Sequence, residues 1–139
     1  MGIRKRLEEE YDYDIVEEFI DHFDIMCGSM ELAIIALENG NHELEKVHEL
    51  FRIVHNIKSA SGYFNLKDLN YLAQISEEVI EALRFDISNL SIEVIDWLFA
   101  VSDQFRSWYE QLEDDDENLE DIRTEVLNIP EIIWQLESD

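Results

Sequence analysis

The chain has 139 residues with 34 acidic and 10 basic side chains, and its formal net charge is −24. A surface with this much negative charge repels nucleic acid phosphates and anionic lipid. We therefore expect neither nucleic acid nor a membrane as a partner. Apolar residues make up 46% of the chain, with only four glycines and one proline, which favours one globular domain built from long helices.

Apolar residues recur every three or four positions in four long stretches, and this spacing predicts amphipathic helices. We expect these helices at residues 12–38, 42–64, 67–84 and 91–112. No long stretch alternates apolar and polar residues, so no sheet is expected. Four such helices with short connections pack as an antiparallel up-and-down four-helix bundle, and the fold class is therefore all-α.

The two ends of the chain differ from the bundle in composition. An acidic stretch, EDDDEN, follows the fourth helix, and a short additional C-terminal helix is expected at 119–127. A turn carrying Ile132, Ile133 and Trp134 is expected after Pro130. We expect the first ten residues and the last few to fray. The predicted parts are an N-terminal extension at 1–11, the bundle at 12–112 and a C-terminal extension at 113–139.

Cys27 is the single cysteine, which excludes an internal disulfide and predicts a cytoplasmic location. It lies among Phe23, Met26 and Met30 in the first apolar stripe, so we expect a buried structural thiol. The N-terminal MGIRKRLEEE is basic and then acidic, with no apolar segment, and resembles neither a signal peptide nor a membrane span.

The stretch HNIKSASG, residues 55–62, carries the candidate site. His55 lies outside the apolar stripe of its helix, and a neutral imidazole nitrogen is a nucleophile. Lys58, one turn further on, offers a cation that would offset the charge of a phosphoryl group on the ring. Ser59 and Gly62 remove bulk beside the ring, so that a second protein could approach it closely.

Basic residues gather around this histidine. Between Leu7 and Glu45 the chain has no lysine or arginine. A local positive region is then expected on the second helix and its end, from Lys46, Arg52, Lys58 and Lys67.

The segment FRIVHNIKSASGYFNLKDLNYLAQISEEV resembles the histidine phosphotransfer (HPt) domain, and most closely the N-terminal domain of CheA-type chemotaxis histidine kinases. Phe51, Arg52, His55, Lys58 and Gly62 match the family motif. The resemblance extends over about residues 12–112. It implies a helical bundle whose histidine accepts a phosphoryl group on Nε2.

Four further positions bear on this resemblance. Ser59 and Asn65 stand where the family has glycine, and asparagine tolerates a positive φ. Gln74 replaces a second histidine. Glu77 falls on the family's glutamate, and the resemblance implies that Glu77, together with Gln74, orients the imidazole.

The resemblance implies a phosphorelay carrier that exchanges a phosphoryl group with a histidine kinase and with the aspartate of a response-regulator receiver domain. Arg52 is the expected receiver contact. Any Mg²⁺ would belong to the partner, and we expect no metal or cofactor on this chain. Without a glycine-rich phosphate loop, the chain is expected to lack an ATP site of its own.

The residues leave one other function open and exclude several more. A non-catalytic helical adaptor that only binds a receiver domain or kinase stays open as an alternative. A di-iron bundle needs two Glu-x-x-His motifs, and only Glu45 with His48 supplies one. Zinc sites of the usual kind need more cysteines. A freestanding protein is favoured by Met1 and the acidic C-terminal extension, and a fragment of a kinase stays open.

Overall fold

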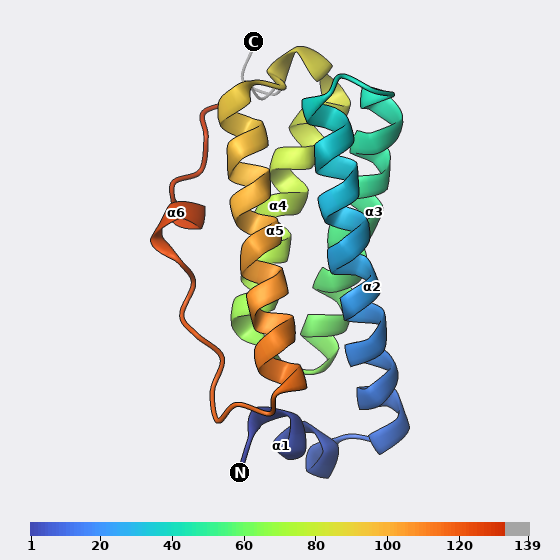
Figure 1. The fold of residues 1–139 in the computed structure, drawn as a ribbon, viewed down its shortest axis with the longest axis vertical. Coiled ribbons are helices and arrows are strands. Elements are labelled where there is room, and N and C mark those ends of the chain that lie inside the picture. Colours follow the sequence, from blue (N-terminus) through green and yellow to red (C-terminus); the bar gives the residue numbers. More distant parts are fainter. Residues whose placement is uncertain (133–139) are drawn as a thin grey trace.

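The computed structural model describes residues 1–132, which fold as helices without a strand. The four long helices run alternately up and down, which confirms the antiparallel bundle with an additional C-terminal helix (Figure 1). The predicted turn residues Ile133 and Trp134 lie outside the described residues. The elements in chain order are α1 Ile3–Glu10, α2 Tyr13–Glu38, α3 Glu43–Tyr63, α4 Lys67–Phe85, a 3₁₀ turn η1 Ile87–Asn89, α5 Ile92–Glu113 and α6 Thr124–Leu127.

The core runs along the bundle axis and takes one apolar stripe from each long helix. Cys27 is 2% exposed within it, and burial raises the pKa of its thiol to about 12. The thiol therefore stays protonated at neutral pH, which confirms the buried structural role. The bulkiest fully buried side chains include Trp108, Phe23, Phe105, Ile20 and Met30. No helix within residues 1–132 combines the length and hydropathy needed to cross a bilayer.

Local capping explains where the helices begin and end. The Asp12 carboxylate accepts hydrogen bonds from the main-chain N–H groups of Asp14 and Ile15 at the start of α2, and Ser91 accepts one from Val94 at the start of α5. Asn65 follows α3 with φ of 60°. Asparagine is one of the few residues other than glycine that tolerates this left-handed conformation.

The expected fraying of the first ten residues is wrong. These residues form α1, which lies across the end of the bundle near the start of α2 and the end of α5 (Figure 1). Leu7 is 6% exposed and joins the core. The Arg4 guanidinium donates hydrogen bonds to Glu17 and Glu113, two carboxylates on different long helices. Tertiary contacts thus order a helix that is too short to be stable alone.

Replacing Arg4 with alanine is expected to lower the free energy of unfolding by about 1 kcal/mol, because the lost ion pairs form a part-buried network. The loss should shrink at high salt, which screens the pairs. Urea denaturation at low and high salt measures both effects. Lys5→Ala is the matched control, since the Lys5 side chain is exposed and forms no ion pair with any residue from 1 to 132. Equal losses in the two variants would contradict the prediction.

After α5 the chain turns back as a C-terminal strap, residues 114–132, which runs beside that helix (Figure 1). Glu120 anchors it, and its main-chain oxygen accepts a hydrogen bond of 2.9 Å from Trp108 Nε1. Trp97 Nε1 donates to the main-chain oxygen of the fully buried Val126. The Glu120 carboxylate accepts hydrogen bonds from the side chains of Gln104, Ser107, Gln111 and Arg123.

The predicted helix at 119–127 is too long, because only Thr124–Leu127 of the strap is helical. Side chains of α5 satisfy the strap's main-chain groups instead. Gln111 Oε1 accepts a hydrogen bond from the N–H of Glu120, and Gln104 Oε1 accepts one from the N–H of Arg123. Buried backbone groups need partners, and here the partners come from a neighbouring helix instead of the segment's own turns.

Candidate functional site

His55 lies in the second half of α3, on the side that faces α4. Its side chain is 52% exposed, as the position outside the apolar stripe predicts. The two helices form the most extensive helix pair of the bundle. The site is therefore built on two long, well-packed elements.

Glu77 of α4 joins the two predicted site residues of α3. Its Oε2 lies 2.7 Å from His55 Nδ1, and its Oε1 accepts a hydrogen bond of 2.7 Å from Lys58 Nζ. An ionised carboxylate only accepts, so the proton of a neutral imidazole must sit on Nδ1. The lone pair of Nε2 is then free on the exposed ring.

The Glu77 carboxylate is held in its ionised form. Burial acts to raise its pKa, but the hydrogen bonds from Lys58 and His55 outweigh burial, and the pKa lies below the ordinary value. A carboxylate with a lowered pKa in the folded protein adds stability above its unfolded pKa. That stability is lost as the pH falls through the folded value.

Replacing Glu77 with glutamine is expected to destabilise the protein at pH 5 by more than at pH 3. The wild type's advantage over this variant requires the ionised carboxylate, so it should decline below the ordinary glutamate pKa of 4.5. Urea denaturation of both proteins at a series of pH values between these limits measures the difference. A constant difference over this range would contradict the prediction.

The other residues expected to act on the ring or its phosphoryl group lie as follows. Lys58 is bound to the Glu77 carboxylate, and its side chain is 30% exposed. Gln74 lies one turn before Glu77 with its side chain exposed, and it forms no hydrogen bond with His55 in the described part of the chain. Of the two expected orienting residues, the structure therefore brings only Glu77 to the imidazole. The roles in phosphoryl transfer stay predictions.

The residues expected to admit or contact a partner lie along α3. Ser59 and Arg52 are exposed, and Arg52 forms no ion pair among residues 1–132. Gly62 is also exposed, but a Cβ there would come within 3.3 Å of the Asn70 side-chain amide of α4. Gly62 therefore also permits a close approach of the two helices.

Two residues of α4 near the site, Asn70 and Arg84, were not predicted from the sequence. Asn70 Nδ2 donates a hydrogen bond of 2.8 Å to the main-chain oxygen of Lys58. The Arg84 guanidinium lies 4.1 Å from the centroid of the Phe51 ring, which stacks on the His55 imidazole at 6.1 Å between centroids and 7° between planes. Their spacing could have identified them, since both lie seven residues from Glu77.

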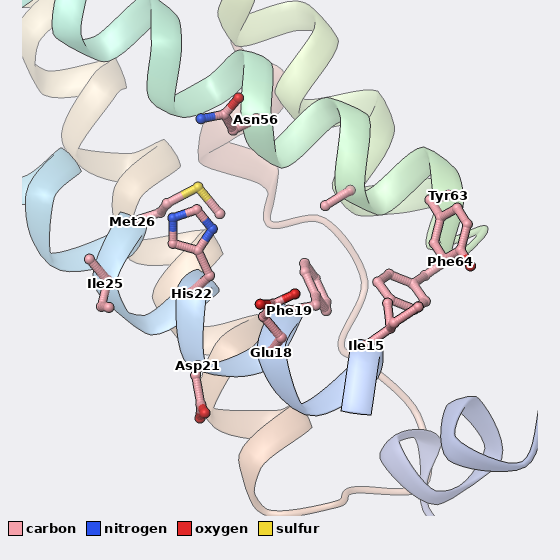
Figure 2. A pocket seen from close by; sticks show the side chains of 11 residues that line it. Ile15, Glu18, Phe19, Asp21, His22, Ile25, Met26, Asn56, Tyr63 and Phe64 are labelled. Carbon is pink, nitrogen blue, oxygen red and sulfur yellow. The ribbon is translucent and has the colours of Figure 1, made fainter. Parts of the chain in front are cut away.

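A largely apolar groove of about 590 Å³ lies on the other side of α3, between that helix and α2. Asn56 and Tyr63 line its α3 wall (Figure 2). From α2, His22 and Met26 project toward that wall, and Ile25 is 63% exposed beside them (Figure 2). The α3 wall of the groove therefore includes the residue that follows His55, although His55 itself does not line the groove.

Comparisons with known proteins show similarity to chemotaxis proteins. The chain is 25% identical to the chemotaxis protein CheA of Bacillus subtilis over 107 residues, which cover 77% of this chain and 16% of that protein. It is 31% identical over 71 residues to CheA of Rhizobium meliloti, covering 51% of this chain and 9% of the relative. It is 25% identical over 83 residues to the sensor histidine kinase CheAY of Helicobacter pylori, covering 60% of this chain and 10% of that protein.

This chain thus spans a small part of each of these relatives, and no solved structure matches it significantly. The Hpt domain model matches residues 14–129. That match includes the four long helices and continues past residue 112 into the C-terminal strap. The chain belongs to the Hpt domain family.

Proposed function

We propose that the chain is a phosphoryl carrier of a two-component phosphorelay and that His55 is the phosphorylated residue. One observation carries the proposal: Glu77 binds Nδ1 of an imidazole that is half exposed, which leaves Nε2 free for a partner protein. Membership of the Hpt family and the similarity to CheA and CheAY support histidine phosphotransfer. The cytoplasmic location expected from the single cysteine stays a prediction.

The transfer needs little chemistry from the protein beyond orientation and charge. The Nε2 lone pair attacks the phosphorus, a P–N bond forms, and the bond from phosphorus to the donor oxygen breaks with its electron pair leaving on that oxygen. The Nδ1 proton stays hydrogen-bonded to Glu77, which offsets the positive charge on the ring. In the onward step, an aspartate oxygen attacks the phosphorus and the P–N electrons return to Nε2.

Lys58 is the proposed cation for the phosphoryl group. Its ammonium binds the second oxygen of the same carboxylate that holds His55, which keeps a cation beside the imidazole. The proposed donor and acceptor are a histidine kinase and a receiver domain, with any Mg²⁺ supplied by the partner. The groove between α2 and α3 is the proposed docking surface for the receiver domain, because it offers exposed apolar side chains such as Ile25 and Tyr63 and its α3 wall includes Asn56, the residue that follows His55.

Incubation with phosphoramidate, followed by intact mass measurement, tests the carrier. The expected result is a single acid-labile phosphoryl group per chain, which a receiver domain then removes as its own aspartate becomes phosphorylated. A folded protein that takes no phosphoryl group from phosphoramidate or from a CheA-type kinase, and still binds receiver domains, would replace the carrier with a non-catalytic adaptor.

A further inference from the structure

Three side chains of α4 contact α3 on the side that carries His55: Asn70, Glu77 and Arg84. They are spaced seven residues apart. Residues seven apart lie on the same side of a helix, two turns from one another. Glu77 stands in the middle and holds His55 and Lys58. Asn70 and Arg84 stand two turns before it and two turns after it, so the three contacts fix α4 along α3 at three heights.

The Arg84 contact reaches His55 through one aromatic ring. Its guanidinium covers Phe51 at 4.1 Å, and Glu81 accepts a hydrogen bond of 3.2 Å from its Nη1. Phe51 precedes His55 by one turn, and the two rings are nearly parallel. A cation over an aromatic face is attracted by the ring quadrupole, so Arg84 restrains Phe51. A restrained Phe51 ring one turn away would in turn limit rotation of the imidazole.

The Asn70 contact acts on the turn that carries Lys58. Its amide donates to the Lys58 main-chain oxygen, and the Ser61 hydroxyl donates to the same oxygen at 3.2 Å. Gly62 favours this approach, because a Cβ there would lie 3.3 Å from the Asn70 nitrogen and would press on the amide. The amide therefore ties α4 to the backbone of the site where the glycine leaves room for it.

We propose that Asn70 and Arg84 are positioning residues for His55, which hold α3 and α4 at the separation and height where one Glu77 carboxylate meets both the imidazole and Lys58. The expected effect of these residues on the rate of phosphoryl uptake rests on the proposed carrier function. Their expected effect on the tautomer of the His55 imidazole does not. Neither residue touches the phosphoryl group; both act through Phe51, the Lys58 backbone and Glu77.

The test compares Arg84→Met, Arg84→Lys and Asn70→Ala with the wild type. Nitrogen-15 NMR of the imidazole reports the share of neutral His55 rings with the proton on Nδ1, and phosphoramidate uptake reports the rate. Arg84→Met and Asn70→Ala are each expected to lower that share and to slow uptake about tenfold, the scale of a modest loss of orientation. Arg84→Lys, which keeps a cation for Phe51, should recover most of both.

Arg106→Met is the matched control. Arg106 also pairs with a carboxylate, Asp24, and lies over an aromatic ring, Tyr109, but it joins α5 to α2 away from the site. An unchanged tautomer and rate in folded Arg84→Met overturn the role of Arg84, and the same result in Asn70→Ala overturns that of Asn70. Failure of the wild type to take up phosphoryl groups from either phosphoramidate or a CheA-type kinase would overturn the carrier function instead. The imidazole tautomer in the variants would still test the positioning role of Asn70 and Arg84. Circular dichroism establishes folding, and the partly exposed Arg84 can be replaced without opening the core.

Discussion

Replacing His55 with glutamine is expected to abolish phosphoryl uptake. Glutamine offers no nucleophilic ring nitrogen, because the lone pair of its amide nitrogen is delocalised into the carbonyl. The variant should remain folded, with a free energy of unfolding within about 1 kcal/mol of the wild type, since the replaced side chain is half exposed. Intact mass after incubation with phosphoramidate measures uptake, and urea denaturation measures stability.

His48→Gln is the control, and it should take up phosphoryl groups at the wild-type rate. His48 is exposed and lies seven residues before His55 on the same side of α3. In the described part of the chain, its ring has no carboxylate partner like Glu77. Undiminished uptake by His55→Gln, or its loss in the control, would place the phosphorylated residue elsewhere.

Replacing Trp108 with alanine is expected to cost about 4 kcal/mol of the free energy of unfolding. The side chain is the largest of those that are fully buried, and Phe105 packs edge-on against it at 6.0 Å. Its Nε1 also holds the strap through the main-chain oxygen of Glu120. Since a domain has roughly 5–15 kcal/mol of stability in total, the urea midpoint should fall sharply.

Trp108→Phe separates the two contributions. Phenylalanine keeps most of the apolar volume but donates no hydrogen bond to Glu120, so a loss of about 1–2 kcal/mol is expected. Far-ultraviolet circular dichroism during urea denaturation measures both variants without relying on tryptophan emission. Equal losses in Trp108→Phe and Trp108→Ala would show that the strap contact, and not the buried volume, accounts for the effect.

The sequence predicted best what depends on spacing within one helix. The boundaries of α2, α3, α4 and α5 agree with the expected ranges within a residue or two, because one apolar stripe defines each of them. The exposure of His55 follows from its angle to the stripe of α3, and the burial of Cys27 follows from its place in the stripe of α2.

Two predictions from the sequence were wrong, and in both cases contacts between distant segments outweigh local helix propensity. Residues 1–10 carry too few apolar side chains to form a helix alone, yet Leu7 and Arg4 attach α1 to the end of the bundle. The helix expected at 119–127 is shortened because Gln104 and Gln111 bind the strap's main-chain groups. Neither outcome is visible in a window of neighbouring residues.

The sequence by itself therefore determined the bundle, the exposed histidine and the lysine one turn away, since all three depend on the period of a single helix. The family resemblance named Glu77 and Gln74 as partners of that histidine, and only the tertiary structure decided that Glu77 is the one that meets it. Glu77 is 22 residues from His55 and reaches it because α3 and α4 pack together, with Asn70 and Arg84 at matching heights. The free Nε2 of the ring is thus a property of two packed helices, because α3 has no carboxylate within one turn of His55 to hold Nδ1.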